Sequence, residues 1–150
     1  MLFQNANGSM IAIPRRKIDG WWQRTKKIKN ISDMDSARLA MAIDCEGSVV
    51  VCKRGHTKRL KWRGKETRIL IYNTDLRLLD WAFDVTGLGT IRKHNNGSGA
   101  LPTKKITWVW ECSYLSSYQV LKRVLPWLIL KREKALESLD WYSNLDLCLE

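Results

Sequence analysis

The sequence predicts an α+β domain of the order αββαββα, in which two β-hairpins form one antiparallel, saddle-shaped, four-stranded sheet with helices on a single face. Two observations predict this fold class. Segments with helix-capping residues alternate along the chain with pairs of short segments that have the composition and alternation of strands. The chain of 150 residues, 45% of them apolar, is also sufficient for one domain with a buried core.

The first helix and the first hairpin begin after a basic stretch. Ser32 and Asp33 supply N-cap chemistry for a helix over 35–45, and Gly47 ends it. The strands of the first hairpin are predicted at 48–54 and 67–72, and a basic connection at 55–66 joins them.

A second helix and a second hairpin follow. The helix is expected over 75–86, with Asn73 and Thr74 as caps and Gly87 at its end. Four of its side chains are expected to face inward: Leu76, Leu79, Ala82 and Phe83. The strands of the second hairpin are predicted at 90–94 and 105–113.

The last strand has two unlike faces. Its residues alternate between two sets, Ile106, Trp108, Trp110 and Cys112, and Lys105, Thr107, Val109 and Glu111. We expect the tryptophans to pack in the core and the second set to face solvent or a partner. A third helix at 114–124 precedes Pro126, which is well placed to begin a fourth helix that runs to about residue 142.

The charge of the chain indicates a polyanionic partner. Lys and Arg number 26 against 15 Asp and Glu, a net charge of +11, so nucleic acid is the first expectation and an anionic membrane surface the second. Between Lys53 and Arg68 there are eight basic residues and one acid, Glu66. A basic sheet of this size can lie along a duplex with strand side chains in the major groove.

The first 30 residues form a basic arm that precedes a single domain at 31–150. The arm has seven basic residues and one acid, with no period of 3.6 or 2. Two interpretations remain open: a solvated tail, or a segment that becomes ordered on DNA while Trp21 and Trp22 pack on the domain.

Membrane insertion and secretion are not expected. The longest nearly apolar run, 124–130, contains Pro126 and is far shorter than the roughly 20 residues of a spanning helix. The N-terminus has no basic segment followed by an apolar stretch of signal-peptide length. The cysteines, Cys45, Cys52, Cys112 and Cys148, form no C-x-x-C pair, so we expect free thiols and a reducing, intracellular compartment.

The motif with chemical significance is LAMAIDCEG at 39–47, followed by Ser48. It resembles the signature of the LAGLIDADG homing endonucleases, with Glu46 at the final acidic position. The resemblance extends in order over roughly 33–142, through NTDLRLLDW at 73–81, GLG at 87–89 and LPWLILKR at 125–132. It implies the αββαββα fold, intron or intein mobility, and site-specific cleavage of double-stranded DNA.

The single copy of the motif implies a homodimer, because each strand of a duplex needs its own cut. The target is then long and approximately palindromic. The resemblance places Leu39, Ala40, Ala42 and Ile43 at the dimer interface. Met41 departs from the family, since it stands where the family has a packing glycine, and this implies a wider or rotated helix interface.

The resemblance also implies the catalytic groups. Glu46 and the backbone carbonyl of Cys45 are expected to bind Mg²⁺ or another divalent ion such as Mn²⁺. Lys131 matches a lysine beside the scissile phosphate, and Asn73 a polar residue that orients a metal-bound water; their alternatives are a surface helix lysine and an N-cap. Asp44 is expected to be structural.

The uncovered sheet face is expected to contact DNA. Carrying the alternation on from Gly47, together with the basic connection, selects the following residues: Ser48, Val50, Cys52, Arg54, Lys58, Arg59, Lys61, Arg63, Arg68, Leu70, Tyr72, Arg92, His94, Lys105, Thr107 and Glu111. Arg92 is the best candidate for a guanine contact. A shift of one residue in register would exchange the two faces.

Two other functions stay open on the same fold. One is a non-cleaving transcription regulator that binds DNA, and the other is an RNA-splicing maturase. The set of Glu46, Lys131 and Asn73 favours the endonuclease, because a binding protein has no need of it. The expected location is with the host DNA, in a phage-infected or bacterial cytoplasm, an archaeal cell or an organelle, and the sequence does not distinguish these.

Overall fold

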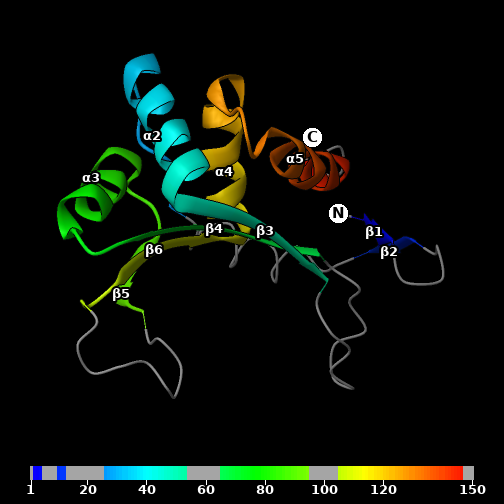
Figure 1. The fold of residues 1–150 in the computed structure, drawn as a ribbon. Coiled ribbons are helices and arrows are strands. Elements are labelled where there is room, and N and C mark those ends of the chain that lie inside the picture. The colour runs from blue at the N-terminus through cyan, green and yellow to red at the C-terminus, as the bar shows by residue number, and fades with distance from the viewer. Residues whose placement is uncertain (1, 5–9, 13–25, 54–64, 95–104, 147–150) are drawn as a thin grey trace.

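The structure is a computed structural model that describes residues 2–4, 10–12, 26–53, 65–94 and 105–146. Its elements, labelled in Figure 1, are β1 (Leu2–Gln4), β2 (Met10–Ala12), α2 (Asp33–Glu46), β3 (Gly47–Lys53), β4 (Lys65–Asn73), α3 (Leu76–Thr86), β5 (Thr90–Lys93), β6 (Trp108–Ser113), α4 (Tyr114–Val124), the 3₁₀ turn η1 (Leu125–Trp127) and α5 (Arg132–Asp146). From α2 onward they follow the predicted order αββαββα and a last helix.

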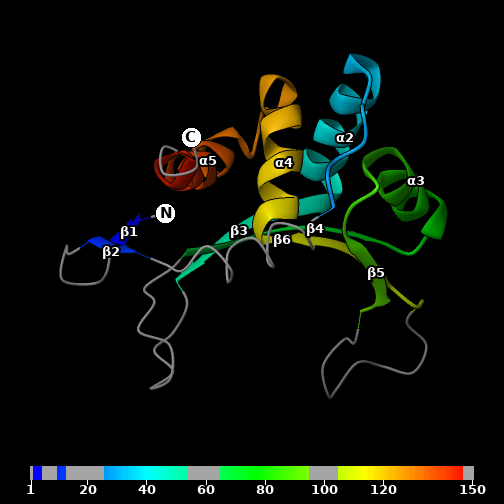
Figure 2. The same ribbon diagram turned by 180° about the vertical axis from the view of Figure 1, so that it is seen from behind.

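The four strands β3 to β6 form one antiparallel sheet in the spatial order β3-β4-β6-β5. Helices α2, α3 and α4 stand on one face, and the opposite face carries no helix in either view (Figures 1 and 2). The strands bend away from the helices at both ends, so the uncovered face is concave. The predicted fold class is therefore confirmed.

The strand register agrees with the predicted alternation. Ile69 lies opposite Val49 on one side and Cys112 on the other, and Ile71 lies opposite Gly47 and Trp110. Ile69, Ile71 and Trp110 have no exposed surface, and Trp110 Nε1 donates to the Leu88 carbonyl oxygen at 3.0 Å. The even-numbered residues of β4 consequently belong to the uncovered face.

The junction between α2 and β3 requires a glycine. Ser32 caps α2, because its side chain accepts from the backbone N–H of Asp35. A Cβ at Gly47 would lie 2.7 Å from the Leu70 carbonyl oxygen and 2.9 Å from that of Ile43. Gly47 therefore lets the helix end directly against the second strand of the sheet.

Helix α3 differs from the prediction at its N-terminal cap and in the exposure of one side chain. Its N-cap is Asp75, whose side chain accepts from the Arg77 N–H, rather than Asn73 or Thr74. Arg77 also pairs with Asp75 and lowers the pKa of that carboxyl to about 2. Phe83 was expected to face inward, but it is exposed, because Leu79 and Ala82 fill the buried side of the helix. Gly87 ends the helix with a φ of 67°, as predicted.

The last strand and the last helix begin later than predicted. β6 starts at Trp108 and not at residue 105, and the half-exposed Ile106 does not join the core. Pro126 lies in η1 and does not start the fourth helix, which begins at Arg132. The reason is tertiary: a carboxylate of α2 accepts hydrogen bonds from the backbone of Ile129 and Lys131 and holds this segment outside any helix.

The N-terminal region contains two elements that the sequence did not predict. β1 and β2 pair antiparallel over three residues each. Just before α2, Lys29 N–H donates to the Thr86 carbonyl oxygen and Ile28 N–H to Gln119 Oε1, so this part of the chain packs on the domain. Among the described residues, no helix is long and apolar enough to cross a membrane.

Candidate active site and nucleic-acid interface

The C-terminal end of α2 presents two oxygen donors side by side in the sequence. Glu46 is the last residue of the helix, and both Glu46 and Cys45 are exposed. A helix leaves its last carbonyl groups without intrahelical partners, and the Cys45 carbonyl is one of these. Carboxylate and carbonyl oxygens are the ligands that Mg²⁺ prefers, so the donor set fits this ion. In the described part of the chain no three His, Cys, Asp or Glu side chains come together, so water or a second chain would have to complete the site.

Asp44, two residues before Glu46 in the motif, is buried and connects α2 to the segment before α5. Asp44 is 4% exposed, its Oδ2 accepts from Ile129 N–H at 2.7 Å, and its Oδ1 accepts from Lys131 N–H at 3.0 Å. We call these three residues the Asp44 link. The structural role expected for Asp44 thus consists of hydrogen bonds across 85 and 87 positions of sequence.

The Asp44 link places the Lys131 ammonium at the end of the motif helix. Lys131 Nζ donates to the Asp44 carbonyl oxygen, one of the last carbonyl groups of α2. A positive charge is favoured at this end of a helix. Lys131 is half-buried, so its ammonium is neither a free surface group nor removed from solvent.

Asn73 ends β4 two residues beyond Ile71, the register partner of Gly47. It therefore lies beside the junction of α2 and β3. Its Oδ1 accepts from the Asp75 N–H at 2.8 Å, which is a local turn contact rather than the cap of α3. The amide nitrogen Nδ2 is the donor that remains for a water or phosphate oxygen. The structure thus places the three predicted catalytic residues at or beside the C-terminal end of α2: Glu46, Lys131 and Asn73.

The predicted DNA-contacting residues within the described strands share the uncovered face, but Leu70, which was expected to contact DNA, is buried there between its strand neighbours. Their registers are Ser48 with Leu70, Val50 with Arg68 and Cys52 with Glu66 across β3 and β4, and Leu70 with Glu111 and Tyr72 with Val109 across β4 and β6. His94 follows β5 and packs edge-on against Tyr72, with ring centroids 4.9 Å apart. Lys105 is exposed and Thr107 half-buried just before β6. Arg54, Lys58, Arg59, Lys61 and Arg63 lie outside the described residues.

Ion pairs join the charged residues at the centre of this face. Glu111 Oε2 accepts from Arg92 Nη2 at 3.0 Å and Nε at 3.3 Å, and Glu111 Oε1 lies 3.6 Å from Arg68 Nη1. Arg68 Nε donates to Glu66 Oε1 at 2.8 Å, and this bond is the main reason why the pKa of Arg68 is raised. We call these four side chains the Glu111 network. Sequence reasoning missed it, although the alternation of β6 already placed Glu111 on this face.

The exposed side of α2 differs from the expected interface residues. Leu39, Ala40 and Ile43 have no exposed surface, because they pack in the core of the single chain, and Ala42 is partly buried against it. The exposed residues of α2 include a row with helical spacing: Met34, Arg38, Met41 and Cys45. Ile129, which belongs to the Asp44 link, and the adjacent Leu130 are 70% and 74% exposed.

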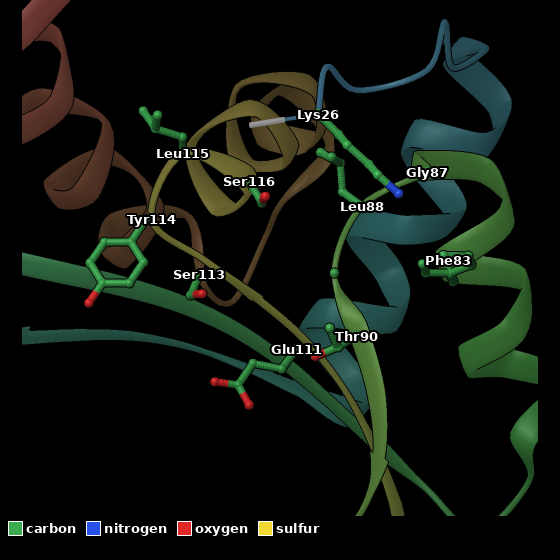
Figure 3. A pocket seen from close by; sticks show the side chains of 11 residues that line it. Lys26, Phe83, Gly87, Leu88, Thr90, Glu111, Ser113, Tyr114, Leu115 and Ser116 are labelled. Atoms are coloured by element: carbon green, nitrogen blue, oxygen red, sulfur yellow. The ribbon is translucent and has the colours of Figure 1, made fainter. Parts of the chain in front are cut away.

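An open hollow of about 500 Å³ lies apart from the end of α2, where α3, β5 and the start of α4 meet. Figure 3 shows its wall, which combines Lys26, Phe83 and Leu88 with Thr90 and Glu111. None of the predicted catalytic residues lines it.

Solved structures with the same fold are homing endonucleases. I-CvuI in complex with its target has a TM-score of 0.60 and 22% sequence identity, over 72% of this chain and 65% of that chain. I-CvuI with the I-CreI target and Mg, with the DNA not cleaved, has a TM-score of 0.57 and 25% identity, over 74% and 68%. The group I intron-encoded I-CeuI complexed with DNA has a TM-score of 0.54 and 16% identity, over 86% and 64%.

This chain thus has the fold of the LAGLIDADG homing endonucleases, as the motif at the end of α2 indicated. The match spans about two thirds of the length of I-CvuI and I-CeuI. Neither a protein-family model nor a curated protein sequence matches the chain.

Proposed function

We propose that this protein is a site-specific endonuclease that cuts double-stranded DNA as a homodimer with a divalent ion, at a long, pseudo-palindromic target. The observation that carries the proposal is the end of α2, where Lys131 Nζ bonds the helix terminus next to the exposed Glu46. Two endonucleases with the same fold, I-CvuI and I-CeuI, are described in complex with DNA. A protein that only binds DNA has no need of an acid and an ammonium so placed.

The catalytic groups have separable tasks in this proposal. Glu46 and the Cys45 carbonyl would hold Mg²⁺ or Mn²⁺, which supplies activation of water and neutralisation of charge on the phosphate when bound. The Lys131 ammonium lies at the helix end and would stabilise negative charge that develops on a phosphate oxygen. Asn73 Nδ2 would orient a water, since its Oδ1 is already used by Asp75.

The exposed side of α2 supports the proposed homodimer. Large apolar side chains at the surface, here Met34, Met41, Ile129 and Leu130, are typical of a protein interface. A two-fold axis along this side of α2 would bring the two Glu46 residues near each other, so that each strand of the duplex has an acid. Met41 is half-exposed and its sulfur accepts from Cys45 Sγ at 3.5 Å, so the helices would pack through sulfur-bearing side chains.

Selection of cleaved molecules from a randomised duplex library, with Mg²⁺ and in parallel with EDTA, tests the proposal. We expect a long, two-fold symmetric consensus with breaks in both strands in Mg²⁺ alone. A symmetric sequence that is bound but never cut would favour the transcription regulator. Preferred binding of RNA over DNA in competition would favour the maturase, since the major groove of A-form RNA is closed to a β-sheet.

Cysteine labelling tests the two proposed interfaces in a Cys148→Ser background. We expect a maleimide at pH 8 to modify the exposed Cys45 and Cys52 in the folded protein, and Cys112 only after unfolding, because burial raises the pKa of its thiol. Duplex DNA should protect Cys52, which lies on the uncovered face. At protein concentrations high enough to form the dimer, Cys45 should be protected from the maleimide even without DNA.

Mass spectrometry of the labelled peptides measures both effects, with unfolded protein as the control for full reactivity. Equal labelling of Cys52 with and without DNA would contradict the proposed DNA face. Labelling of Cys45 that is independent of protein concentration would contradict the α2 interface.

A further inference from the structure

One carboxylate at the centre of the uncovered face lies between two arginines from the two neighbouring strands. Glu111 belongs to β6, Arg68 to β4 and Arg92 to β5. The Glu111 side chain is only 16% exposed although it is on the face without helices, whereas that of Arg92 is 52% exposed. In Figure 3 the Glu111 carboxylate points away from the helices α3 and α4. The Glu111 carboxylate contacts both arginines on this face.

The two guanidinium groups are held in different ways. Arg68 is bonded through Nε to Glu66 and faces Glu111 with Nη1, so acids hold it from two sides. Arg92 turns its Nε and Nη2 edge to one oxygen of Glu111. The other edge of Arg92, formed by Nη1 and the second hydrogen of Nη2, takes no part in this contact.

The net charge of the Glu111 network suits a DNA base better than a phosphate group. Two arginines and two glutamates sum to zero, so the centre of the face is neutral within a chain of net charge +11. An acid at this position would repel a phosphate. A base edge has no net charge and presents only hydrogen-bond donors and acceptors. The network therefore suits the bases in the groove rather than the backbone.

We propose that Glu111 is a specificity-determining positioning residue, which orients Arg92 so that the outer edge of its guanidinium bonds a guanine in each half of the DNA target. This inference rests on the proposed function. In the major groove, guanine alone presents the two adjacent acceptors, O6 and N7, that one guanidinium edge can bond together. A guanidinium already fixed along one edge loses less conformational entropy when the other edge binds.

Binding selection from a randomised duplex library, in EDTA so that hydrolysis does not interfere, tests this role. We expect the wild-type protein to select guanine at one symmetry-related position of each half-site. Glu111→Gln and Arg92→Lys should each reduce the preference for guanine there by about tenfold or more, while preferences elsewhere remain. Glu133→Gln, the same change at an exposed acid in the first turn of α5 with no proposed part in DNA binding, is the matched control and should leave that position unchanged.

Arg92→Lys retains the charge on an exposed side chain, so it remains informative if Glu111→Gln folds poorly in circular dichroism. The salt dependence of binding should be the same for Glu111→Gln and wild type, because phosphate contacts are not involved. An unchanged consensus for both variants would overturn the inference while leaving the proposed function intact. A wild-type protein that selects no sequence at all would overturn the proposed function itself.

Discussion

Replacement of Glu46 by glutamine is expected to abolish DNA cleavage while target binding stays within a few-fold of wild type. Glutamine has the same shape but no negative charge, so it cannot hold a divalent ion as a carboxylate does. Glu46 is exposed at the end of α2, so the substitution should not disturb the core. We expect a decrease in the single-turnover cleavage rate of about 100-fold or more, the usual cost of losing a group that stabilises the transition state.

The measurement compares cleavage in Mg²⁺ with binding in EDTA on the same duplex. Glu133→Gln is a matched control, since Glu133 is an exposed acid in the first turn of α5 and has no proposed part in catalysis. Its cleavage rate should equal that of wild type. If Glu46→Gln cleaves at a near-normal rate, Glu46 is not the metal ligand.

Replacement of Asp44 by alanine is expected to lower the free energy of unfolding by about 3 kcal/mol, because it leaves the N–H groups of Ile129 and Lys131 without acceptors at a cost of about 1–3 kcal/mol each. The same change releases the segment that brings the Lys131 ammonium to the end of α2. Cleavage should therefore decrease at temperatures where the variant is still folded. Urea unfolding and single-turnover cleavage measure the two effects.

Two further variants separate the stability of the fold from the position of Lys131. Asp80→Ala removes an exposed carboxylate from α3 and should change stability by less than about 0.5 kcal/mol. Lys131→Met removes the ammonium and keeps the Asp44 carboxylate bonded to the backbone, so cleavage should fall with a small change in stability. A stable Asp44→Ala protein with normal cleavage would contradict the role of the Asp44 link.

The elements and the register were predictable where the signal is local. The helix Tyr114–Val124 has the predicted bounds, and the alternation through Ile69 and Ile71 placed the correct side of β4 in the core. Period and capping depend on residues a few positions apart, which explains this success. The start of α5 at Arg132 was not predictable, because hydrogen bonds to Asp44 from a distant part of the chain determine it.

The candidate site likewise has residues that the sequence indicated and contacts that it did not indicate. The family resemblance implied Glu46, Lys131 and Asn73, and the structure brings their elements to one end of α2. The Asx turn of Asn73 and the Glu111 network were not indicated by spacing. In both, the partner of a polar group is selected by geometry after the strands have paired.

By itself, the sequence determined the order of the elements and the two faces of the sheet, since composition and short periods suffice for these. The candidate catalytic residues came from the resemblance of the motif and of later segments to the LAGLIDADG homing endonucleases. Only the tertiary structure decided which side of α2 is exposed. Leu39, Ala40 and Ile43 are apolar and helical in either arrangement, but packing on the sheet buries them and leaves Met41 outside. Burial depends on which surfaces meet across the fold, and a local pattern does not contain that information.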